Sequence, residues 1–158
     1  MSSRRKARET VLKLLYLSES RSISIDMAFD EMLAVDNEIA EKGNNSEINH
    51  LKPFSLGLDE KQKVYVLALC RKIEENSEIL NNHIKPVLIN WDFERISRID
   101  RIILWIALAE MLYMPDIPIT VSMNEAIELA KKFSSKKSSS FINGVLDATA
   151  VNIGVKQT

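Results

Sequence analysis

The sequence predicts an all-α fold, and three observations predict it. Glycine and proline are scarce, with four of each in 158 residues. Apolar residues recur at three- and four-residue intervals along most of the chain, which is the period of an amphipathic helix. The β-branched residues do not alternate in strand-like runs. With 46% hydrophobic residues, the chain can bury the core of one domain without disulfides or metals.

The first helix is expected from about Ser3 to Leu17, with a buried stripe of Ala7, Val11, Leu14 and Leu15. Its first two turns carry Arg4, Arg5, Lys6 and Arg8. Cations at this end oppose the helix dipole, at a cost of roughly 0.3–1 kcal/mol per group. Folding alone does not explain them, and arginines can bind phosphate through two hydrogen bonds. The pattern favours a nucleic acid as the partner.

A second helix is expected from Ser24 to about Glu41, followed by a loop from Gly43 to Leu58. Asp59 is a candidate N-cap for the third helical region. We expect a break in that region near Asn76 and Ser77, and an end or kink at Pro86, which lacks a backbone N–H.

The segment from Trp91 to Met114 is the most apolar part of the chain and is interpreted as a central helix. After Pro115 and Pro118, the spacing of Ser122 and Glu125 is that of a capping box, which predicts that the next helix opens at Ser122.

A polar turn over residues 134–138 separates that helix from a last one, whose apolar period resumes at Phe141. Lys136 and Lys137 would then lie just before a helix N-terminus, where free N–H groups attract anions. Gly144, inside the last helix, costs about 1 kcal/mol relative to alanine. A close backbone approach or a ligand would explain it.

The sequence excludes several function classes. No signal peptide or membrane span is evident, so a cytoplasmic protein is expected. Cys70 lies among apolar residues and is expected to be a small buried side chain. No catalytic constellation, glycine-rich phosphate loop or set of metal ligands is found, so we expect neither an enzyme nor a cofactor or metal site.

Five motifs in order indicate a family: RRKARETVLKLLY, ILNNHI after Asn76, WDFERISRIDRIILWIALAEM, IPITVSMNEAIELAKKF and FINGVLD. Over essentially its whole length the chain resembles the NusB family of bacterial transcription antitermination factors. The resemblance implies about seven helices, in two packed three-helix bundles with one further helix. We therefore expect a single NusB-like domain over 1–158, with subdomains of about 1–85 and 86–158.

The resemblance also implies a function without catalysis. Proteins of this family bind the boxA element of nascent ribosomal RNA together with NusE, a small-subunit ribosomal protein. The complex helps RNA polymerase to read through terminators. Some relatives are thought to self-associate through the RNA-binding face, so a homodimer remains open here.

Residue roles follow from the same resemblance. The RNA contacts it implies are Arg4, Arg5, Lys6 and Arg8 at the N-terminal tip, and Lys136, Lys137, Phe141 and Asn143 in the second basic region. The positions it implies for NusE are Tyr16 and Asp100. Three residues depart from the family pattern: Trp105 stands where an arginine is common, Asn81 where an aspartate is frequent, and Lys72 where a small residue is common.

One alternative function from another class stays open. A helical protein-interaction module could keep this fold and use the basic clusters against an acidic protein surface. Binding to boxA-type RNA, with and without NusE, separates the two.

Overall fold

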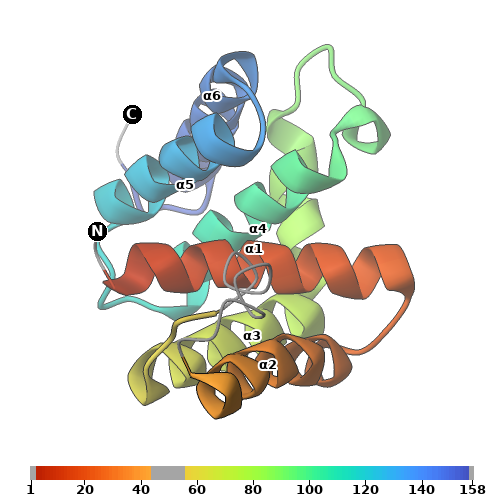
Figure 1. Cartoon of the computed structure of the whole chain (residues 1–158). Helices are drawn as coiled ribbons and strands as arrows, with labels where there is room; N and C mark the ends of the chain where they lie inside the picture. Colours follow the sequence, from red (N-terminus) through yellow and green to blue (C-terminus); the bar gives the residue numbers. More distant parts are fainter. Residues whose placement is uncertain (1–2, 44–55, 157–158) are drawn as a thin grey trace. The chain divides into compact units, whose positions relative to one another are not determined.

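The computed structural model describes residues 3–43 and 56–156 of the chain. All regular secondary structure in these ranges is helical (Figure 1). The α-helices are α1 (Ser3–Arg21), α2 (Ile25–Lys42), α3 (Glu60–Ile84), α4 (Arg98–Tyr113), α5 (Ile119–Phe133) and α6 (Lys136–Asn152), and two short 3-10 helices are η3 (Lys85–Val87) and η4 (Phe93–Arg95). The predicted all-α class is confirmed.

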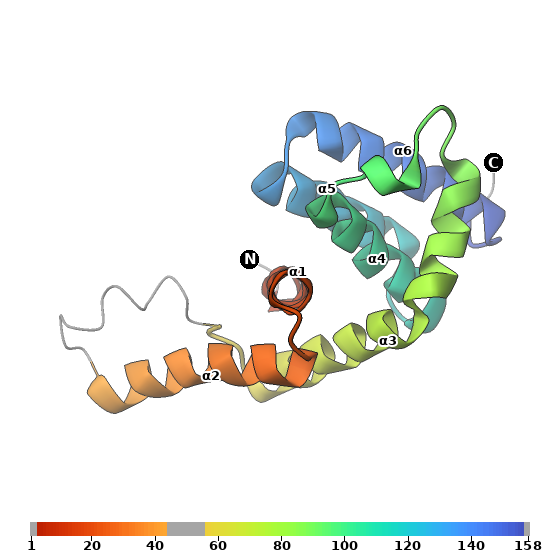
Figure 2. The same cartoon turned by 90° about the vertical axis from the view of Figure 1, so that its right-hand side faces the viewer.

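The chain divides into two compact units, Met1–Val66 and Leu67–Thr158, and α3 runs through the division. In the first unit α1 packs against α2, and Figure 2 views α1 nearly end-on beside it. The predicted stripe of α1 is buried: Ala7, Val11 and Leu14 are fully inaccessible to solvent. Helix α1 continues to Arg21, one turn beyond the predicted end.

Side-chain caps fix the ends of the elements in this unit. Ser24 caps α2 by accepting a hydrogen bond from Met27 N. Asp59 and Gln62 form a reciprocal pair, in which each side chain accepts the other's backbone N–H at 2.8 Å. The predicted cap at Asp59 is therefore confirmed, and its partner is the glutamine three residues later.

The second unit begins with the rest of α3, which bends where the sequence predicts a break (Figure 2). Asn76 has non-helical dihedrals of φ −123° and ψ 15°. Its Nδ2 donates to the carbonyl of Lys72 at 2.8 Å, so the side chain stabilises the bend. Helix α3 ends at Ile84, and Pro86 lies in η3.

The expected helix from Trp91 to Met114 is wrong in its first part. Residues before Arg98 form a connection that contains η4, and Ser97 caps α4 by accepting from Asp100 N. Asn90 has a positive φ of 59°, a conformation that turns the chain and that asparagine tolerates. Helix α4 itself is central as predicted, because it is buried from Ile102 to Met111.

Helices α5 and α6 pack on each other and both contact α4. The predicted capping box at Ser122 is wrong, because α5 already begins at Ile119. Ser122 is 1% exposed, and its hydroxyl donates to Glu110 Oε1 of α4 at 2.8 Å. The serine satisfies a buried carboxylate instead of capping a helix.

Two of the three residues expected to depart from the family pattern, Trp105 and Asn81, contact each other. Trp105 is 7% exposed, and its indole N–H donates to Asn81 Oδ1 at 2.8 Å. The guanidinium of Arg101 lies 4.4 Å from the centre of the indole ring. A neutral hydrogen bond thus joins α4 to α3 at this point.

Cys70 is fully buried as predicted, and burial raises the pKa of its thiol far above the ordinary value. Among the described helices, none combines the length and the apolar character that crossing a membrane requires.

Candidate nucleic-acid interface

The first basic cluster lies in the first turn of α1, which has no acidic residue. We define the α1 cluster as Arg4, Arg5 and Lys6. Arg4 is exposed, and its guanidinium lies 5.2 Å from the ring centre of Tyr65. Lys6 is half-buried and passes close to Gly57, where any Cβ would collide with the lysine ammonium group. These contacts hold the cations at the start of the helix.

Arg8, in contrast to Arg4, is buried. It is only 2% exposed, so its side chain is not available to a phosphate at the surface of this structure. The sequence places it with the other cations because a buried arginine cannot be distinguished from a surface one by spacing alone. We leave it out of the α1 cluster.

The second basic region lies at the start of α6. Ser135 is the N-cap, and its hydroxyl accepts from Ser138 N at 3.0 Å. Lys136 and Lys137 are the first two residues of the helix, which corrects the expectation that they precede it. Both are exposed, and the first turn of α6 contains no acidic residue.

The two lysines at the end of α5, Lys131 and Lys132, lie close to other side chains of the same helix. Lys131 lies 3.6 Å from Glu128, and Lys132 lies over the ring of Phe133 at 5.4 Å. Cations in a last helical turn also favour the dipole, so their place needs no ligand. Within the described residues, neither Lys136 nor Lys137 makes an ion pair. The later pair is the better candidate for binding an anion.

Phe141 and Asn143 follow on α6. Phe141 is half-buried, and its ring centre lies 5.5 Å from that of Trp91 with a tilt of 43°. Asn143 is exposed. We define the α6 cluster as Lys136, Lys137, Phe141 and Asn143.

An apolar groove of about 270 Å³ opens beside this cluster. The connection after α3 forms one wall and α6 the other, with the lining residues Val87, Leu88, Ile89, Trp91, Ser140, Phe141, Gly144 and Val145. A Cβ at Gly144 would meet no protein atom within 4 Å. The expected close backbone approach at Gly144 is therefore wrong, and the glycine instead keeps the groove open.

Trp91 is the site residue that sequence reasoning missed. It is 51% exposed, whereas the sequence placed it at the start of a buried helix. Two signals could have separated it from that helix. Asn90 is a residue that tolerates positive φ, and Asp92 caps η4 by accepting from Glu94 N at 3.1 Å.

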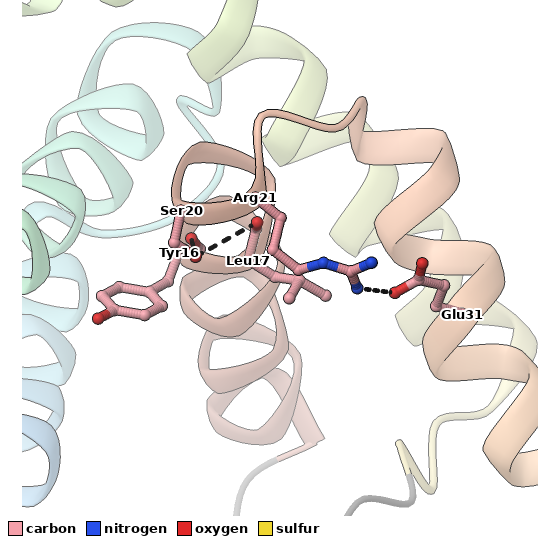
Figure 3. Close-up of polar contacts among 5 residues, drawn as sticks. All are labelled: Tyr16, Leu17, Ser20, Arg21 and Glu31. Carbon is pink, nitrogen blue, oxygen red and sulfur yellow. Dashed lines mark hydrogen bonds and ion pairs between the residues drawn. The ribbon is translucent and has the colours of Figure 1, made fainter.

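The two residues expected to contact a protein partner differ in exposure. Tyr16 is 43% exposed, and Figure 3 shows its ring pointing away from Arg21, which forms an ion pair with Glu31 of α2. Asp100 is 8% exposed in the first turn of α4. Tyr16 thus offers a surface to a partner, and Asp100 offers very little.

The chemistry of the site is that of binding. Among the described residues, no group of three or more histidine, cysteine or acidic side chains is placed to hold a metal ion. Exposed cations, an amide and a half-buried aromatic ring can bind phosphates, hydrogen-bond bases and stack against them.

Comparison with known proteins decides the family. The profile of the NusB family matches residues 5–150. The chain belongs to the NusB family. It is 40% identical over 145 residues to the transcription antitermination protein NusB of Clostridium kluyveri, covering 91% of this chain and 92% of that protein. The NusB of Clostridium botulinum strain Hall is 39% identical, with 91% and 96% covered.

Solved structures agree with this fold. NusB of T. maritima superposes with a TM-score of 0.72 at 29% identity, covering 95% of this chain and 91% of that one. A NusB in a complex of antitermination factors NusB and NusE with double-stranded RNA gives 0.71 at 21% identity, with 94% and 96% covered. At that identity the second likeness supports the fold alone.

Proposed function

We propose that this chain is a non-enzymatic, RNA-binding transcription antitermination factor. It binds the boxA element of nascent ribosomal RNA together with NusE, and the complex promotes read-through by RNA polymerase. The observation that carries this proposal is the match to NusB-family antitermination proteins at about 40% identity over 91% of the chain. A protein that acts on nascent transcripts works in the cytoplasm of a bacterium.

The geometry supports a division of roles. The α1 cluster and the lysines of the α6 cluster bind RNA phosphates. Phe141 offers a surface for stacking, and the exposed amide of Asn143 hydrogen-bonds a base edge. Recognition of single-stranded RNA normally combines these two kinds of contact.

Tyr16 is the proposed contact to NusE, because its ring is 43% exposed. Asp100 is also a proposed contact to NusE, but its side chain is less accessible than that of Tyr16. With 8% exposure, its carboxylate reaches a partner only if the side chain turns outward.

A binding experiment tests the function. Labelled single-stranded boxA RNA is mixed with the chain, with NusE and with both, and complexes are separated by gel filtration. We expect a ternary complex that binds RNA more tightly than either protein alone. A chain that binds neither the RNA nor the NusE–RNA mixture would overturn the proposal. A chain that binds NusE but leaves the RNA affinity unchanged would favour the alternative, a protein-interaction module.

The finer architecture is also part of this proposal. We propose two three-helix bundles with one further helix, in which the first bundle extends to about residue 85 and so includes the part of α3 that belongs to the second compact unit. The count of about seven helices corresponds to treating the two parts of α3 separately at Asn76. Self-association through the RNA-binding face stays a prediction as well. Sedimentation with and without RNA tests it, because a masking dimer must dissociate when RNA binds.

A further inference from the structure

Large apolar side chains of the groove beside α6 are exposed to solvent. Ile89 is 83% exposed and Trp91 is 51% exposed, although both are large apolar side chains. They share the groove with Phe141, whose ring is tilted against Trp91 at 5.5 Å. Exposed apolar patches of this kind commonly mark a binding surface.

Cations border the groove on its α6 wall. Residues four apart on a helix lie on one face, so Lys136 is one turn before Ser140 and Lys137 is one turn before Phe141. Ser140 and Phe141 both line the groove. An anionic group on an occupant of the groove would therefore lie near Lys136 or Lys137.

From this arrangement we propose that the groove binds one unstacked nucleobase of the RNA against the indole ring of Trp91, while Lys136 and Lys137 hold the adjoining phosphate. This inference rests on the proposed function and deepens it, since it adds Trp91 and Gly144 to the RNA contacts. The groove, at about 270 Å³, is small for a ligand pocket and suits a single planar group.

The charges around Trp91 favour a nucleotide over an acidic peptide. The next residue, Asp92, is exposed and holds η4 by accepting from Glu94 N at 3.1 Å. An acidic peptide would bring further carboxylates close to Asp92, the exposed neighbour of Trp91. A neutral base stacked on the indole keeps its phosphate on the lysine side of the groove.

Gly144 provides a test that does not depend on damage to the fold. A Cβ there meets no protein atom within 4 Å, and leucine is a far better helix former than glycine. Gly144→Leu should therefore fold at least as stably as the native chain while it fills the groove. Trp91→Leu removes the aromatic face, and Trp91→Phe, its conservative control, retains one.

RNA affinity with NusE present is measured for these variants over a series of salt concentrations. Removal of one base stack should weaken binding about 5- to 100-fold in Trp91→Leu and Gly144→Leu, with an unchanged salt slope because every lysine that binds a phosphate is retained. Trp91→Phe should retain most of the affinity. The same RNA is also made abasic at successive positions, and at one of these positions the change should weaken binding to the native chain but not to Trp91→Leu.

The outcomes separate the two proposals. Native affinity in both Trp91→Leu and Gly144→Leu, in a chain that binds boxA RNA with NusE, overturns the base-binding groove and leaves the proposed function standing. A reduced salt slope in Trp91→Leu also overturns it, because the tryptophan would then act through the lysines. If the native chain binds no RNA with NusE, both proposals fail.

Discussion

At the scale of single residues, two departures from the family pattern form one contact. Trp105 and Asn81 are joined by a hydrogen bond of 2.8 Å. An arginine and an aspartate at the same places could make an ion pair there. The sequence marks both departures, but only the structure shows that the two side chains contact each other.

We therefore predict that the two exchanges are coupled. Trp105→Arg alone should destabilise the chain by about 3 kcal/mol, because it buries a charge beside Arg101 without a partner. Adding Asn81→Asp should recover roughly 1–2 kcal/mol, within the range typical of contacting pairs. Urea unfolding of the two single variants and the double variant measures the coupling. Strictly additive changes would show that the two positions do not act as a pair.

Exposure divides the N-terminal arginines into two groups. Arg4→Ala with Arg5→Ala should change stability by less than about 1 kcal/mol, because relief of the unfavourable dipole interaction offsets lost contacts such as that of Arg4 with Tyr65. It should reduce the salt slope of RNA binding by roughly 0.7 for each phosphate that the variant no longer neutralises. Arg8→Ala should instead cost on the order of 2–4 kcal/mol, because Arg8 is 2% exposed. A lower salt slope with normal stability in Arg8→Ala would show that this residue binds RNA after all.

At the scale of the elements, the helical period of the apolar residues predicted which helix faces are buried. The side chains that cap the helix starts were harder to predict. The stripe of α1, the break at Asn76 and the end of α3 before Pro86 all follow from spacing and from proline chemistry. Ser122 was misassigned because serine followed by glutamate three residues later fits a capping box, although Ile119 already begins the helix. Trp91 was missed because its apolar side chain matches the adjoining apolar helix, and only its neighbours Asn90 and Asp92 indicate that it lies outside that helix.

Ser122 in α5 and Ser135, the N-cap of α6, should respond differently to substitution. Ser135→Ala removes the N-cap of α6 and should cost about 1 kcal/mol. It should also lower hydrogen-exchange protection in the first turn of α6. Ser122→Ala removes a hydrogen bond to Glu110, which is fully buried, and should cost about 1–3 kcal/mol with no local fraying at the start of α5. Loss of protection over the residues after Ser122 would restore the capping interpretation.

At the scale of the whole molecule, the candidate RNA contacts are divided between the two compact units. The α1 cluster belongs to Met1–Val66 and the α6 cluster to Leu67–Thr158. The net charge of −1 hides both, because acidic residues elsewhere balance them. From the sequence, the candidate cations were identified as the basic residues whose positions helix stability does not explain. Which of those cations are exposed had to come from the structure.

We propose that the cations at the start of α6 contact RNA. Two matched pairs of lysine variants test this contact. RNA affinity with NusE is measured at increasing salt for Lys136→Ala with Lys137→Ala, and for Lys131→Ala with Lys132→Ala. For the first pair we expect weaker binding and a salt slope reduced by roughly 0.7 per neutralised phosphate, and for the second pair we expect native behaviour. Equal effects of the two pairs, or weaker binding confined to the second pair, would contradict this proposal.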